Sequence, residues 1–294
     1  MRHPISTQRI VRGATSASLS WQATDADGEP TAPTGAVTVT VTRSDGTALY
    51  TDEPTTGTGT DPRTLALTVA DVATVDRLTV IWSDDSTAVG SEYVDVVGGT
   101  VGTKAALSAI EATLSGVTDA EFARARRSAE NRFISVTDRL PFHRLEVQQF
   151  QNSPDCYLDG SWWPDLVEVR WARLYTTPTA YTALTAGQLA DIATPDPLAR
   201  FNRQGTSWSG SYGVEVGYVA GMSSIPDDLR RAFALAVRRE VTILNTGVPD
   251  QSATFGTIDG ATFGLARPGR GRAYGIDDID DVFTQYADPR PVVA

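Results

Sequence analysis

Apolar and polar residues alternate along the first third of the chain, from Ala17 to Val97, most plainly over residues 37–41 and 78–82. An alternation of period two is typical of strands that bury one face. Turn-forming pairs such as Asp27-Gly28 and Asp45-Gly46 separate the alternating stretches. The pattern therefore predicts five or more short strands that close into an all-β sandwich over residues 1–98.

The periodicity changes at the run Gly98-Gly99-Thr100-Val101-Gly102. Two adjacent glycines allow the chain to change direction at low steric cost, and such runs often separate domains. We therefore expect a domain boundary after residue 98 and a second domain over residues 99–294.

Helical spacing of apolar residues predicts four helices in the second domain, at about 104–114, 118–135, 226–246 and 277–286. Thr118 and Glu121 form a capping-box pattern, and Pro226 precedes two aspartates suited to the positive end of a helix. These signals predict a mainly α-helical domain.

A β region interrupts the predicted helices at about 157–220. Strand-like patterns at Val167–Tyr175 and Val214–Val219 flank polar sequence rich in Thr, Pro and Gly. An imperfect repeat at 253–256 and 261–264 predicts a hairpin or a projecting loop, and residues 287–294 form a proline-containing extended tail. The predicted fold class is thus an N-terminal β-sandwich followed by a mainly helical domain with an inserted β region.

The 294-residue chain is acidic, with 25 Lys and Arg against 36 Asp and Glu and a formal charge of −11. Residues 1–98 have 6 basic and 13 acidic residues, so this part is the more strongly acidic. Such a surface disfavours tight wrapping by DNA or binding to anionic membranes.

Cys156 is the single cysteine, which excludes an intrachain disulfide. Residues 1–11 have no signal-peptide core, and no stretch approaches a membrane span of about 20 apolar residues, so we expect a soluble cytoplasmic product.

Few residues indicate catalysis. The two histidines, His3 and His143, accompany no nucleophile motif, and no phosphate-cradling glycine pattern occurs between a strand and a helix. Asp25–Gly28 is better explained as a turn than as a calcium loop, and Asp277–Asp281 as the start of a helix than as a metal site. We expect no enzyme activity, no catalytic residues, no cofactor and no metal.

Six tryptophans remain to be explained. Trp21, Trp82 and Trp171 follow strand alternation and are expected in the core. Trp162, Trp163 and Trp208 lie in loop contexts, where aromatic side chains fill interfaces or stack on sugars. An alternative hypothesis is therefore a carbohydrate-binding or adhesion module on a virion or host surface.

Two motifs resemble a known family. One is the strand–Gly–Pro–acid–Leu–Ala passage over residues 214–232, and the other is the closing segment, residues 275–286, followed by Pro289, Arg290 and Pro291. In their order, they and the preceding helix from Thr118 resemble the head-to-tail adaptors, or head-tail connectors, of long-tailed bacteriophages. The β domain resembles the immunoglobulin-like modules that decorate phage particles.

The resemblance implies a structural virion protein of the phage neck that assembles in the host cytoplasm. Its subunits would form a closed ring of twelve below the portal, as part of the DNA conduit. Expected partners are further copies of the chain, the portal protein and a stopper or head-completion protein, while double-stranded DNA passes without specific binding and no membrane is involved.

The resemblance also places two sets of contact residues. The predicted portal-docking residues lie at the C-terminal end: Tyr286, Asp288, Pro289, Arg290, Pro291, Val292 and Val293. The predicted ring interface, which would face an acidic patch on the next subunit, consists of arginines on two helices: Arg124, Arg126, Arg127, Arg132, Arg230, Arg231 and Arg238.

Overall fold

The computed structural model describes residues 8–151, 156–157, 165–190, 200–201, 213–246, 254–256, 262–264 and 274–287. The chain forms two compact units. The β unit comprises Met1–Gly99, His143–Leu158 and Leu166–Ala220, and the helical unit comprises Thr100–Phe142, Asp159–Asp165 and Gly221–Ala294. The predicted division into domains at residue 98 stays a prediction.

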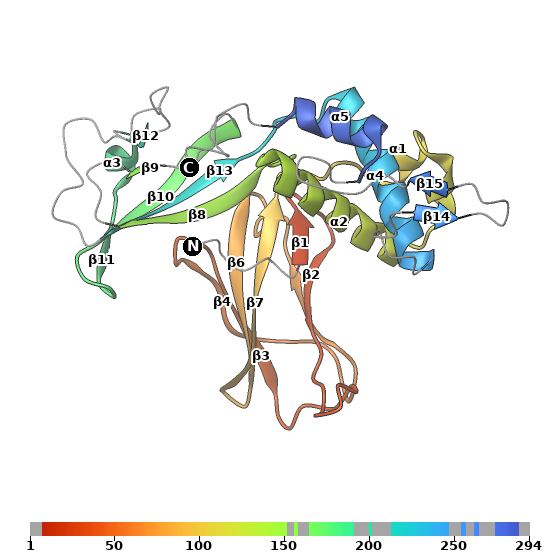
Figure 1. Cartoon of the computed structure of the whole chain (residues 1–294). Coiled ribbons are helices and arrows are strands. Elements are labelled where there is room, and N and C mark those ends of the chain that lie inside the picture. The colour runs from red at the N-terminus through yellow and green to blue at the C-terminus, as the bar shows by residue number, and fades with distance from the viewer. Residues whose placement is uncertain are drawn as a thin grey trace. The chain divides into compact units, whose positions relative to one another are not determined.

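The N-terminal part of the β unit is a two-sheet sandwich, drawn in red to yellow in Figure 1. A five-stranded sheet has the order β1-β7-β6-β3-β4, and a two-stranded sheet pairs β2 with β5. The first strand pairs with the last in parallel, and the remaining pairs are antiparallel. The strands are β1 (Gln8–Val11), β2 (Ala17–Trp21), β3 (Val37–Thr42), β4 (Ala48–Pro54), β5 (Arg63–Leu67), β6 (Asp76–Asp84) and β7 (Thr87–Val97).

The alternating apolar residues form the sandwich core, as their period predicts. Leu19 and Leu67 from the smaller sheet and Val39 and Val80 from the larger one belong to one buried cluster. Trp82 is 1% exposed, which confirms it as a core residue, and its ring stacks with that of Trp21 at a centroid distance of 6.3 Å.

A polar contact stabilises one edge of the sandwich. The Tyr50 hydroxyl donates a hydrogen bond to Asp71 Oδ2, which also accepts from the Thr68 amide and hydroxyl. Burial, together with the bond to Asp71, raises the pKa of Tyr50 from 10.0 to about 12. Burial by itself would raise the pKa of Asp71, but the hydrogen bonds from Tyr50 and Thr68 outweigh it and lower that pKa.

These shifts predict a pH dependence at each end of the scale. Because folding raises the pKa of Tyr50, its contribution to stability is complete below pH 10.0 and is lost as the pH rises towards about 12. Folding lowers the pKa of Asp71, so its contribution is lost in acid.

We expect Asp71→Asn to lower the ionisation pH of Tyr50 in an ultraviolet titration, with Tyr50→Phe assigning the signal. Asp61→Asn, on an exposed residue, is the control; an unaltered Tyr50 titration in Asp71→Asn would contradict the assigned cause.

A second sheet in the β unit has the order β11-β10-β13-β8 and is antiparallel throughout. Trp171 of β10 lies opposite Gly217 of β13, and its ring crosses that position so closely that a Cβ there would come within 2.3 Å of it. The glycine therefore makes room for the indole. The elements are β8 (Arg144–Gln151), β10 (Leu166–Tyr175), β11 (Tyr181–Ala183) and β13 (Gly213–Ala220), with the short α3 (Ala186–Ala190) and the pair β9 (Cys156–Tyr157) and β12 (Arg200–Phe201).

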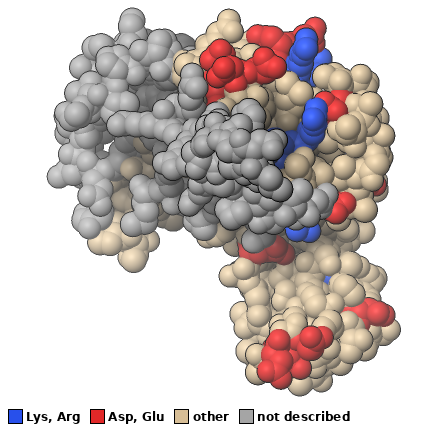
Figure 2. All heavy atoms as spheres, turned by 45° about the vertical axis from the view of Figure 1, so that its right-hand side comes forward, with Lys and Arg blue, Asp and Glu red and all other residues tan. Residues whose placement is uncertain are grey.

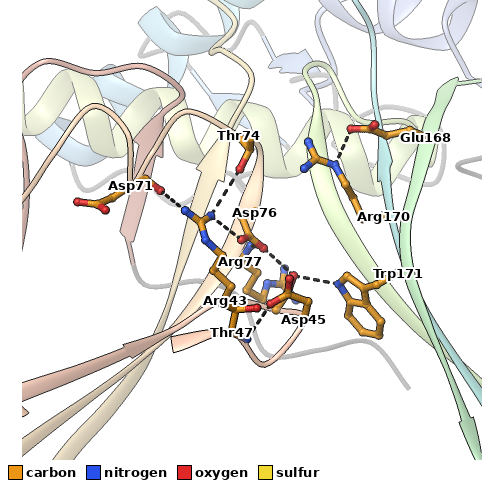
Figure 3. A network of polar contacts seen from close by, with 11 residues as sticks. Arg43, Asp45, Thr47, Asp71, Thr74, Asp76, Arg77, Glu168, Arg170 and Trp171 are labelled. Atoms are coloured by element: carbon orange, nitrogen blue, oxygen red, sulfur yellow. Dashed lines mark hydrogen bonds and ion pairs between the residues drawn. The ribbon is translucent and has the colours of Figure 1, made fainter. Parts of the chain in front are cut away.

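The sandwich and the second sheet are joined within the β unit by polar contacts (Figure 3). Trp171 Nε1 donates to Ser44 Oγ at 3.0 Å, and Ser44 Oγ donates to Asp76 Oδ1 at 2.6 Å. Arg43 Nη1 lies 3.0 Å from the other oxygen of Asp76. A small apolar cluster of Val75, Leu145 and Val219 adds buried contacts.

A buried charge cluster lies at the same junction. Asp95 of β7 is 1% exposed, and its carboxylate lies 2.8 Å from Arg77 Nε and 3.2 Å from Arg144 Nε. Arg144, the first residue of β8, also lies 3.2 Å from Glu146. Burial lowers the pKa of Arg77, but the charge and hydrogen bond of Asp95 outweigh it, so the pKa is raised. One carboxylate thus pairs with arginines from both sheets.

The helical unit follows its predicted local signals. Thr118 and Glu121 form the capping box at the start of α2, and two aspartates occupy the first turn of α4. The imperfect repeat forms the antiparallel pair β14–β15. The elements are α1 (Lys104–Ser108), the 3-10 helix η1 (Ala112–Gly116), α2 (Asp119–Thr137), α4 (Asp227–Thr246), β14 (Thr254–Gly256), β15 (Thr262–Gly264) and α5 (Asp277–Gln285).

The prediction of a mainly α-helical second domain is wrong. In the described part of the chain 36% of residues lie in strands and 28% in helices. Two findings account for this. The segment after residue 99 supplies β8, β10 and β13, whose long antiparallel pairings form the core of a sheet. The expected helix at 104–114 is broken into α1 and η1, because Glu111 bonds the Thr113 amide and hydroxyl and so starts a new turn.

Candidate functional site

The helical unit is organised around three phenylalanines from three helices. Phe133 of α2, Phe233 of α4 and Phe283 of α5 are fully buried, with ring centroids 5.0–5.3 Å apart. Tyr274 packs edge-on against Phe283 at 6.3 Å. This cluster fixes α5 on α2 and α4, so residues 50 to 150 positions apart in the sequence share one core.

The two motifs that carry the family resemblance meet at the start of α4. The Tyr286 hydroxyl donates to both carboxylate oxygens of Asp228, at 2.9 and 3.0 Å. Burial and the bond to Asp228 raise the pKa of Tyr286. The Tyr286 carbonyl accepts a bond from Arg139, whose guanidinium is paired with Asp165. Tyr286 of the closing motif is therefore held by Asp228 of the other motif and by Arg139.

Asp280 explains the fixed shape of the turn before α5. This residue is 2% exposed, and its carboxylate accepts bonds from the backbone amides of Tyr274 and Ile276, both at 2.9 Å. Ile276 itself is 37% exposed. The turn thus presents an apolar side chain beside the exposed Asp277, Asp278 and Asp281.

A hollow of about 490 Å³ lies between α1 and the first turns of α4. Ile110, 42% exposed, lies on one wall, although its helical spacing predicted a buried position. Arg230 Nη1 lies 2.7 Å from Asp227 and donates from Nη2 to the Ile225 carbonyl. The lining residues are Ala106, Ile110, Asp227, Arg230 and Arg231. Figure 2 shows Lys and Arg side chains interspersed with Asp and Glu side chains on one face of the chain.

Several arginines of the predicted ring interface are held by contacts within the chain. Arg132 Nε lies 2.8 Å from the buried Glu240, and its guanidinium lies over the Tyr274 ring at 5.1 Å. Arg126 donates to the Gly102 carbonyl and lies over the Phe122 ring. Arg238 pairs with Glu111 at 3.2 Å. These three, together with Arg230, stabilise the fold of the helical unit whether or not they also contact a neighbour.

Arg231 and Arg124 differ from the others. Both are exposed on their helices, and Arg231 makes no hydrogen bond or ion pair with the described residues. Arg127 is half-buried and has a polar partner of its own. The predicted arginines lie on α2, at the start of α4 and in the middle of α4.

Most residues of the other predicted sites lie outside the described part. Of the portal-docking residues only Tyr286 is described; Asp288 to Val293 fall beyond it. Trp162, Trp163 and Trp208, on which the carbohydrate-binding alternative depends, are also outside the described residues. That alternative stays a prediction.

The described residues contain no group of three or more His, Cys, Asp or Glu side chains arranged to hold a metal ion. Among the described helices none has the length and apolar content needed to cross a membrane.

In the comparisons with known proteins, matches were found among solved structures. No family model matches the chain, and no curated protein matches it. Among solved structures, the chain is similar to one in "Neck of empty GTA particle computed with C6 symmetry", with 15% identity and a TM-score of 0.42. The match covers 67% of this chain and 97% of the other.

Proposed function

We propose that this chain is a structural ring subunit of a tailed-phage neck, a head-to-tail adaptor, and not an enzyme. One observation carries the proposal: the two motifs that resemble the adaptor family are brought together by the fold. Helix α5 packs on α4 through Phe283 and Phe233, and Tyr286 bonds Asp228 at the start of α4. The fold therefore places residues of both motifs in direct contact.

The charge of the chain supports a conduit role. Its formal charge is −11, from 25 Lys and Arg against 36 Asp and Glu. Affinity for duplex DNA comes largely from Lys and Arg contacts that release counterions from phosphates. An acidic ring lets DNA pass without retaining it. We propose a closed ring of twelve subunits in the virion neck, formed in the host cytoplasm, between the portal and a stopper or head-completion protein.

The strand pairing of the sandwich supports an immunoglobulin-like module. The neighbours β7-β6-β3 in one sheet and β2-β5 in the other correspond to strands G-F-C and B-E of that fold. Fold alone does not fix the task of such a module. We propose that it decorates the outside of the neck.

The mass of the purified chain, alone and with the portal protein encoded near it, tests the adaptor role. Native mass spectrometry should detect a ring bound to portal. Deleting 288–294 should leave ring-competent subunits that no longer attach to portal, because the predicted docking residues are lost. A chain that stays monomeric and ignores portal contradicts the proposal, and unchanged attachment of the deletion variant contradicts the docking role of the tail.

A further inference from the structure

The hollow between α1 and α4 has the features of a docking site for an apolar side chain with acidic neighbours. Ile110 is exposed on its wall, and Arg231 lines it without an ion partner among the described residues. Arg230 is neutralised by Asp227 at 2.7 Å, so the charge left over in the hollow is that of Arg231. An occupant with a carboxylate beside an aliphatic group would pair with Arg231 and cover Ile110.

The turn before α5 has the complementary features. Ile276 is 37% exposed, although Tyr274 before it is 4% exposed and Ile279 after it is fully buried. Asp278 and Asp281 are exposed next to it, one helical turn apart. The buried Asp280 holds the turn through two backbone amides, so Ile276 is presented on a rigid support. A preformed turn loses little conformational freedom on binding.

The two surfaces lie on different sides of α4. Asp227 and Arg231 are one turn apart and share the side that faces α1. Helix α5 contacts α4 at Asp228 and Phe233. With about 100° of rotation per residue, these two lie about 100° to one side and about 120° to the other side of Asp227, so α5 packs on the side of α4 opposite Asp227. Figure 1 shows α1 and α5 on either side of α4. A chain with complementary patches on different sides associates head to tail and not as a symmetric dimer.

We propose that the hollow of one copy binds the α5 turn of the next copy, with Ile276 against Ile110 and Asp278 beside Arg231. This contact rests on the proposed ring function and specifies its subunit interface. It assigns the attractive role to Arg231, and not to Arg126, Arg132 or Arg238, whose charges are already paired within the chain.

Charge reversal tests the contact. Arg231→Glu and Asp278→Arg should each weaken self-association roughly 100-fold, because each places like charges together at the interface. Mixing the two variants should restore assembly in rings where they alternate. Each interface then pairs either Glu at 231 with Arg at 278 or the original Arg231 with the original Asp278. The double variant in one chain should assemble for the same reason. Arg12→Glu and Asp27→Arg, on exposed residues of the sandwich, are the matched controls and should not change the assembled mass.

The outcomes separate this contact from the function it rests on. Assembly is followed by light scattering and native mass spectrometry, and the thermal unfolding of each variant confirms that it is folded. Loss in the single variants with recovery in the mixture supports the contact. Rings of unchanged mass in both single variants overturn it and leave the adaptor role intact. If the wild-type chain stays monomeric at millimolar concentration and forms no ring on the portal, both the contact and the adaptor role are overturned.

Discussion

Replacing Phe283 by alanine is expected to lower the free energy of unfolding of the helical unit by about 3–5 kcal/mol, the largest effect of any single change in that unit. The ring is fully buried and contacts Phe133, Phe233 and Tyr274, one residue from each neighbouring segment. Truncation removes this contact area and leaves a cavity between three helices. Urea denaturation of the full-length chain, followed by circular dichroism at helical wavelengths, measures the loss.

Phe283→Leu is the matched control, because it keeps an apolar side chain of similar volume and should cost less than about 1.5 kcal/mol. The alanine variant should also lose self-association, since α5 carries the turn that is proposed to dock on the next copy. A loss of stability below about 1 kcal/mol in Phe283→Ala would show that the helices close over the cavity. It would contradict the role of the cluster as the support of α5.

The parts of the fold that the sequence predicts are those specified by local chemistry. Helix α2 begins at a capping box, Thr118 and Glu121, whose two reciprocal bonds form within one turn of chain. Helix α4 begins with two aspartates at its positive end. Strands β2, β3 and β5 bury every second residue. The hairpin between β6 and β7 turns through Asp85 and Ser86, both with positive φ.

The parts that were missed depend on partners distant in sequence. Strand β8, residues 144–151, has only Leu145, Val147 and Phe150 as apolar residues and no pattern typical of a strand. It is held by pairing along its whole length with β13, some 70 residues later, and by the ion pair of Arg144 with Asp95. No local pattern contains that information.

The candidate site shows the same division. Helical spacing places Leu107, Ile110 and Leu114 on one face, and Leu107 and Leu114 are indeed buried. Ile110 is exposed because the helix stops at Ser108 and the chain restarts at Glu111. The sequence also cannot distinguish Arg231 from the paired arginines, since the carboxylates of Glu240 and Glu111 reach their partners only through tertiary packing.

Removing the carboxylate of Asp95 is expected to destabilise the β unit by about 3 kcal/mol, at the lower end of the range for breaking a buried ion pair. In Asp95→Asn, Arg77 would stay almost completely buried without its partner carboxylate. Arg144 would retain Glu146 at 3.2 Å, which is why we expect the lower end of the range. Urea denaturation followed by tryptophan fluorescence measures the loss, and Trp21, Trp82 and Trp171 of this unit contribute to that signal.

Asp27→Asn, on an exposed turn of the same sandwich, is the control and should stay within about 0.5 kcal/mol of the parent chain. A double-mutant cycle with Arg144→Leu separates the two arginines. If Asp95 joins the sandwich to the second sheet, the Asp95→Asn loss should be smaller in the Arg144→Leu background, with a coupling of roughly 0.5–3 kcal/mol. Additive losses would mean that Asp95 serves Arg77 alone, and the second sheet would then be held to the sandwich by Val75, Leu145 and Val219 and by the bonds of Ser44.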